Sequence, residues 1–190
     1  MAARAAALAP LIAAVRRPAS PATTPTMPPT RADTRASRLG APRASAAPPA
    51  TIGRMATVTQ YEDLPLPAQR IWDVIGDFGD IRKWATIIKE QSVEDGPDGP
   101  VRTLVIGDAT VREARIADSQ YSYTYSILDR PPMNDHRSTV AVIPLDATTS
   151  RLMLTLSVSP YGDQTEEMLV ERHTRALTGN LKAMKAALGL

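Results

Sequence analysis

The feature that most constrains this fold is a change in hydrophobic periodicity along the chain. Between Thr86 and Ser159, apolar and polar residues alternate with a period of two, and runs of Gly, Pro, Asp and Asn separate the segments. Between Gln164 and Leu188, apolar residues instead recur every three or four positions. The first pattern is typical of strands and the second of one amphipathic helix. Consecutive strands followed by a segregated helix predict an α+β fold with an antiparallel sheet.

In detail, the patterns predict about seven strands and three helices. The first helix begins near Pro67, carries an apolar face up to Phe78 and ends at Gly79, and a short second helix covers Asp80–Ala85. The long helix over Gln164–Leu188 covers the concave face of the curved sheet, because no other element is long enough. The expected strands are Ala56–Glu62, Thr86–Glu94, Val101–Ile106, Thr110–Ala117, Gln120–Leu128, His136–Leu145 and Arg151–Ser159, with turns at Asp95–Pro100, Asp118–Ser119 and Asp146–Ser150.

Composition separates residues 1–54 from the rest of the chain. This segment holds eight Arg, no Lys and a single acid, Asp33, so it carries +7 while the remainder carries −5. It has nine Pro and no aromatic residue, a composition that buries too little apolar surface to fold. We expect a disordered basic leader followed by one domain over 55–190. The leader is an organellar transit peptide (plastid or mitochondrion), a natural linker, or a mis-called start before Met55, which would make the protein cytoplasmic.

Several classes of site are excluded or disfavoured by residue content. The chain has no cysteine, which excludes disulfides, thiolate nucleophiles and Cys-based zinc sites. It has only two histidines, His136 and His173, which excludes a His-rich metal site. No Gly-rich phosphate loop and no carboxylate metal cluster is apparent in the sequence, so we expect no metal and no cofactor. The acidic balance of 55–190 disfavours nucleic acid as a partner, and no apolar run is long enough for an integral membrane segment. We expect a monomer or weak dimer that binds a small apolar molecule.

Short motifs spread over residues 56–188 occur in a consistent order. These motifs are Ile71–Phe78 followed by Trp84, Arg102-Thr103-Leu104, a strand with Glu113, Tyr123-x-Tyr125-x-Ile127, Asp135-His136 and Asn180–Met184. Together they resemble the START/Bet v 1-like (SRPBCC) superfamily, and in particular its polyketide cyclase/dehydrase and lipid-transport branch. The resemblance implies a helix-grip fold, in which the curved sheet wraps around the C-terminal helix and encloses a ligand cavity.

The alternation and the resemblance together give candidate cavity residues. Arg102 shares a strand face with Leu104 and Ile106, and a buried guanidinium needs a carboxylate, for which Glu113 on the next strand is the candidate. The alternation leaves open whether Glu113 points inward or lies exposed. The expected ligand-binding residues are Trp84, Arg102, Leu104, Ile106, Tyr123, Tyr125, His173, Leu177 and Asn180, and the expected acid/base residues are Glu113 and His136.

The two histidines and Asn180 each allow two interpretations. His173 lies in the apolar stripe of the last helix and is either an inert core histidine or a cavity-lining donor. Asn180, on the same side, is either a structural amide or a ligand partner. His136 begins a strand and either points into the cavity or lies solvated at a loop end.

Three functions fit these observations. The first is a carrier or binding protein for a lipid, polyketide, isoprenoid or aromatic metabolite. The second is a cofactor-independent cyclase or dehydratase that uses acid/base residues in the cavity. The third is an interaction domain with a vestigial, filled cavity, which a void above about 300 Å³ would contradict.

Overall fold

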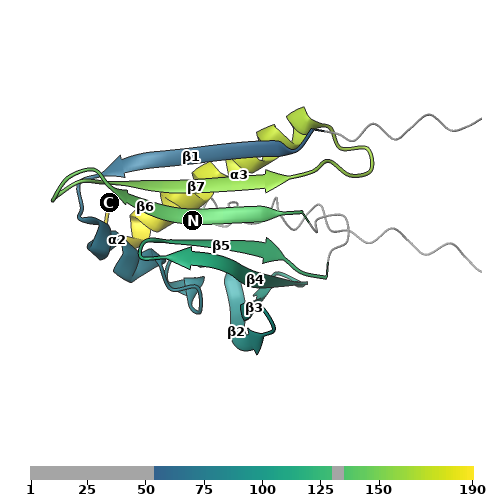
Figure 1. Cartoon of the computed structure of the whole chain (residues 1–190), viewed down its shortest axis with the longest axis horizontal. Coiled ribbons are helices and arrows are strands. Elements are labelled where there is room, and N and C mark those ends of the chain that lie inside the picture. The colour runs from purple at the N-terminus through teal and green to yellow at the C-terminus, as the bar shows by residue number, and fades with distance from the viewer. Residues whose placement is uncertain (1–53, 130–134) are drawn as a thin grey trace, which may run out of the picture. The chain divides into compact units, whose positions relative to one another are not determined.

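A computed structural model describes residues 54–129 and 135–190, and its main element is one sheet of seven antiparallel strands in the order β1-β7-β6-β5-β4-β3-β2 (Figure 1). Neighbouring strands from β2 to β7 are joined as hairpins, and β1 closes against β7 at the far edge. The strands are β1 (Ala56–Leu64), β2 (Ile88–Gly96), β3 (Gly99–Ile106), β4 (Ala109–Ser119), β5 (Ser122–Ile127), β6 (Arg137–Pro144) and β7 (Ser150–Val158). This is the predicted α+β helix-grip arrangement.

Strand β7 illustrates how period-two alternation builds the core. Leu152, Leu154, Leu156 and Val158 are buried, while the residues between them are only half-buried and face the other side. Because successive strand residues point to opposite faces, one face of the sheet is apolar and needs a cover.

The long C-terminal helix α3 (Glu166–Ala187) supplies that cover and packs against β1 and β7 (Figure 1). Thr165 caps its N-terminus by accepting a hydrogen bond from the Met168 backbone N–H, and two glutamates in the first turn suit the positive end of the helix dipole. The buried stripe agrees with the predicted one: Leu169, His173, Leu177, Leu181 and Met184, with Ala176 beside them.

The first described helix, α2 (Ala68–Ile75), is shorter than the predicted Pro67–Phe78 helix. It ends at Gly76 rather than Gly79, and the Trp72 ring folds back over Gly76 so closely that a Cβ there would lie 2.4 Å from a ring carbon. Phe78 therefore lies in a loop, yet it remains buried. The predicted second helix is reduced to the short 3₁₀ turn η1 (Ile81–Lys83).

Two predicted turns were placed wrongly because the strands run further than the alternation indicates. The turn expected over Asp95–Pro100 is only Pro97-Asp98, because Gly96 and Gly99 still pair. The turn expected at Asp118–Ser119 lies at Gln120–Tyr121, since β4 pairs as far as Ser119. A register shift between Arg115 and Ala117 breaks the alternation of β4 at this end.

Two sets of sequence-based expectations fall on residues that the structure does not describe. Those for the basic leader concern residues 1–53, and the Pro-containing segment between the expected strands Gln120–Leu128 and His136–Leu145 includes residues 130–134. Across 54–129 and 135–190, no helix is long and apolar enough to cross a membrane.

Candidate functional site

A small cavity of about 20 Å³ lies between the inner face of the sheet and α3. Such a volume accommodates roughly one water molecule, whereas pockets for drug-sized ligands measure about 300–1,000 Å³. The predicted hollow between sheet and helix is therefore present but nearly filled by side chains. The residues of the cavity wall come from β3 to β7, from α3 and from the η1 segment.

Most of the residues predicted from sequence meet at this cavity. The wall includes Trp84, Arg102, Leu104, Glu113, Tyr123, Tyr125, Leu177 and Asn180. Ile106, His136 and His173 are buried but do not form part of the wall. Ser138, Ile81 and Met184 do, and sequence analysis did not assign them a role in the site.

Arg102 and Glu113 form a buried ion pair in the floor of the cavity. They are partners in the β3–β4 register, and the Arg102 Nε donates to Glu113 Oε2 at 2.6 Å. Their side chains are 2% and 3% exposed. The inward orientation of Glu113, which the alternation left open, is thus settled, and the predicted carboxylate partner of Arg102 is confirmed.

Aromatic rings hold the Arg102 guanidinium in place. Its central carbon lies 4.2 Å from the centre of the Phe78 ring and 4.8 Å from that of Tyr125, within cation–π range. Its Nη1 also donates to the Phe78 carbonyl at 3.3 Å. Burial alone would lower the pKa of Arg102, but the Glu113 carboxylate and the neighbouring tyrosine oxygens outweigh it and raise this pKa. The guanidinium is therefore permanently charged and already compensated.

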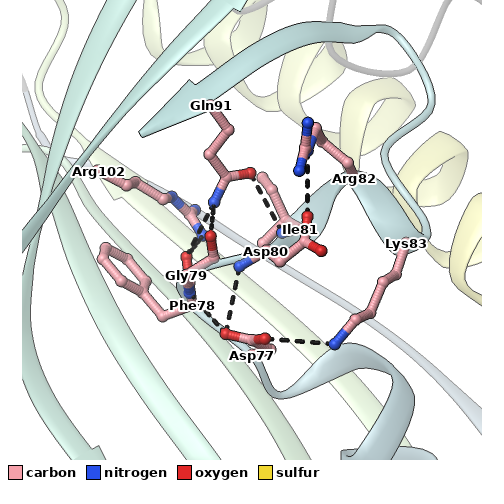
Figure 2. A network of polar contacts seen from close by, with 9 residues as sticks. All are labelled: Asp77, Phe78, Gly79, Asp80, Ile81, Arg82, Lys83, Gln91 and Arg102. Carbon is pink, nitrogen blue, oxygen red and sulfur yellow. Dashed lines mark hydrogen bonds and ion pairs between the residues drawn. The ribbon is translucent and has the colours of Figure 1, made fainter. Parts of the chain in front are cut away.

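Gln91 on β2 fixes the loop that carries Phe78 (Figure 2). Its Nε2 donates to the carbonyls of Phe78, at 3.4 Å, and of Gly79, and its Oε1 accepts from the Ile81 backbone N–H at 3.2 Å. On the outer side of the loop, Asp77 accepts from the Gly79 backbone N–H at 2.8 Å. A single amide side chain thus holds the loop whose phenyl ring stacks on Arg102, a role that no sequence pattern indicated.

Several polar atoms at or near the cavity are buried and have no hydrogen-bond partner within the part of the chain that the structure describes. On its wall these are Trp84 Nε1, the Tyr123 hydroxyl and Asn180 Oδ1. Burial also raises the pKa values of Tyr123 and Tyr125, so both phenols are protonated at neutral pH. Since unpaired buried polar groups are uncommon in folded proteins, their concentration at one cavity needs an explanation.

A second polar group lies behind the cavity wall and contains both histidines. The Ser138 hydroxyl lies 3.1 Å from His136 Nε2. His136 Nδ1 and both ring nitrogens of His173 are buried and have no partner among the described residues. Burial lowers the pKa of each imidazole to about 4, and His173 adds to the effect on His136. The Tyr125 ring lies near both groups: its centre is 4.8 Å from the Arg102 guanidinium carbon and 5.9 Å from the centre of the His136 ring, while His136 pairs with Ser138.

A seven-stranded sheet that wraps around a C-terminal helix, with polar side chains between the two, defines a protein of the START/Bet v 1-like, helix-grip class. The chain belongs to the family described as polyketide cyclase/dehydrase and lipid transport, whose model matches residues 55–189. Membership of this family supports a function in ligand binding or of the polyketide cyclase type. Comparison with curated proteins gives no match.

Solved structures share the fold. The XoxI protein of Bacillus cereus is 25% identical, with a TM-score of 0.60 over 70% of this chain and 95% of that one. A START superfamily protein of Mycobacterium smegmatis is 16% identical, with a TM-score of 0.60 over 70% and 97%. The Zhui aromatase/cyclase of Streptomyces is 21% identical, with a TM-score of 0.55 over 72% and 93%. The last two likenesses show the fold alone.

Proposed function

We propose that this domain binds a small, largely apolar molecule in the space between the sheet and α3. The observation that carries the proposal is the set of unpartnered polar atoms on the cavity wall, namely Trp84 Nε1, the Tyr123 hydroxyl and Asn180 Oδ1. Each costs free energy while it stays unpaired, on the order of 1–3 kcal/mol. A ligand with a polar group would supply the missing hydrogen bonds.

The small volume sets a condition on this function. A ligand larger than water enters only if wall side chains move apart, and Met184, which closes the α3 side, has the flexible side chain for this. The Tyr123 and Tyr125 rings on the wall, whose centres lie 6.2 Å apart, would then contact the apolar part of the ligand. Binding would thus expand a nearly closed interior rather than fill an open pocket.

The proposal is tested by native mass spectrometry of gently purified protein, together with displacement of an apolar fluorescent probe. We expect a co-purified small molecule, or saturable probe binding that competes with added ligands. A protein that is always empty and binds no apolar probe would overturn the proposal and favour a vestigial, filled interior.

A cofactor-independent cyclase or dehydratase is the second candidate, and one observation favours it. Glu113 lines the cavity, and its Oε2 accepts a hydrogen bond from Arg102. A carboxylate in that position is able to take a proton from a bound carbonyl compound. His136 would act through Ser138, which reaches the cavity. Turnover that survives unchanged in both Glu113→Gln and His136→Phe would end these roles.

A further inference from the structure

We infer that the cavity selects electrically neutral ring compounds that carry a hydroxyl or carbonyl group, and discriminates against carboxylates and phosphates of the same shape. The inference deepens the proposed function and rests on it. It follows from the way the charges of the wall are paired and from the atoms that remain unpaired.

The charged groups on the described cavity wall are Arg102 and Glu113, and they cancel each other. Their side chains are in contact at 2.6 Å and almost fully buried. The histidines behind the wall carry no charge at neutral pH, because burial lowers the pKa of each to about 4. An anion that enters this space loses its hydration and finds no free cation, which makes its burial costly.

Arg102 cannot turn to meet an anionic ligand. Its Nε is committed to Glu113 and its Nη1 to the Phe78 carbonyl. The rings of Phe78 and Tyr125 lie against the guanidinium at 4.2 and 4.8 Å. Gln91 in turn fixes the Phe78 loop (Figure 2). Recruiting this cation would break the ion pair and expose an uncompensated Glu113 in the interior.

The unpaired atoms suit a neutral group instead. Trp84 Nε1–H is a donor, the Tyr123 hydroxyl both donates and accepts, and Asn180 Oδ1 accepts. A ligand hydroxyl satisfies a donor and an acceptor at once, and a carbonyl satisfies the donors. The surrounding aromatic rings match a flat apolar body.

The test compares two probes with the same ring system, naphthol and naphthoate, by quenching of tryptophan fluorescence and by calorimetry at neutral pH. Naphthol is uncharged there and naphthoate is an anion. We expect naphthol to bind at least about tenfold more tightly, since an uncompensated buried charge costs more than the free energy of one tenfold step.

Each outcome has a distinct meaning. Equal or tighter binding of naphthoate overturns the selectivity while leaving the binding function in place. Binding of neither probe counts against the binding function itself.

A variant reverses the charge balance. Glu113→Gln leaves Arg102 uncompensated, so naphthoate should bind at least about tenfold more tightly to this variant than to the unaltered protein. Glu94→Gln is the matched control, because Glu94 also pairs with an arginine, Arg112, but at the surface, and its removal should leave both affinities unchanged. If Glu113→Gln does not fold, the comparison of the two probes on the unaltered protein decides alone.

Discussion

Arg102 and Glu113 face each other across the β3–β4 hairpin and join their side chains at 2.6 Å inside the protein. The short loop between the two strands, Gly107-Asp108, fixes this register, because the strands pair up to Ile106 and Ala109 on either side of it. Burying either charge alone in the core would cost much free energy, and the geometry of the hairpin places the two side chains next to each other. The cost of taking both from water makes the pair a weak source of stability but a severe liability when one member is lost.

The first prediction concerns the difference between losing one member of this ion pair and replacing both. Glu113→Gln should destabilise the domain by about 3–5 kcal/mol, since it leaves a buried guanidinium without a counter-charge. The double variant Arg102→Met, Glu113→Leu should recover most of the loss, because apolar groups of similar volume need no pairing. Urea unfolding followed by far-UV circular dichroism measures both. A single variant as stable as the unaltered protein would contradict the buried pair.

Much of the fold follows from the sequence for identifiable reasons. Arg102, Leu104 and Ile106 lie two positions apart on β3 and are all buried, whereas Thr103 and Val105 between them are half-buried, so the inward orientation of Arg102 follows from the period of two. Leu177, Leu181 and Met184 recur at helical spacing, so the buried side of α3 is readable as well. These patterns are local, because each depends only on the residues along one face of a single strand or helix.

The parts that escaped prediction depend on contacts between distant segments or on small polar residues. Gln91 has no periodic partner, yet it holds the Phe78 loop more than ten positions earlier in the chain. Ser138 is a small polar residue that adds nothing to the apolar pattern of its strand, yet it lines the cavity and its hydroxyl pairs with His136. The volume of the cavity depends on how large side chains such as Met184 pack, which no spacing rule describes.

The second prediction tests the role of Gln91. Gln91→Ala removes the hydrogen bonds to the Phe78 and Gly79 carbonyls and from the Ile81 N–H, and should cost about 1–3 kcal/mol. The emission spectrum of Trp84, next to η1, should shift as the loop loosens. Gln120→Ala, at an exposed turn, is the control and should change neither stability nor fluorescence. A loop that stays rigid in hydrogen exchange without Gln91 would contradict the role.

The third prediction is a loss of stability in mild acid. Burial lowers the pKa of His136 and His173 from 6.5 to about 4 in the folded protein. Between these values the unfolded chain binds protons that the folded chain does not, so stability falls as the pH drops from 6.5 toward 4. The loss should approach about 3 kcal/mol for one such histidine, from the free-energy equivalent of a pKa shift of this size.

Urea unfolding at several pH values measures this dependence. The His173→Leu variant places an apolar side chain in the buried stripe of α3 and removes one of the two imidazoles. It should therefore show a shallower fall over the same pH range. An equally steep fall in the variant would show that other groups cause the acid sensitivity.

The fourth prediction links stability to binding through the Tyr123 hydroxyl. Because this buried hydroxyl has no hydrogen-bond partner among residues 54–129 and 135–190, Tyr123→Phe removes an unsatisfied polar atom and keeps the ring contacts with Phe78 and Tyr125. The variant should be more stable than the unaltered protein by about 1 kcal/mol. It should also bind naphthol more weakly, by about fivefold to tenfold, since the ligand loses one hydrogen bond.

Tyr121→Phe is the matched control, because Tyr121 lies two residues away on the same hairpin and its hydroxyl already donates to Gln69 Oε1 at 3.1 Å. That change should give no gain in stability and no change in naphthol affinity. Tyr123→Phe is expected to raise stability and to weaken naphthol binding. This combination distinguishes a ligand-binding hydroxyl from a structural one, because removal of a hydroxyl that stabilises the fold would lower stability. A Tyr123→Phe variant that is both less stable and unchanged in affinity would mean that the hydroxyl supports the core and contacts no ligand.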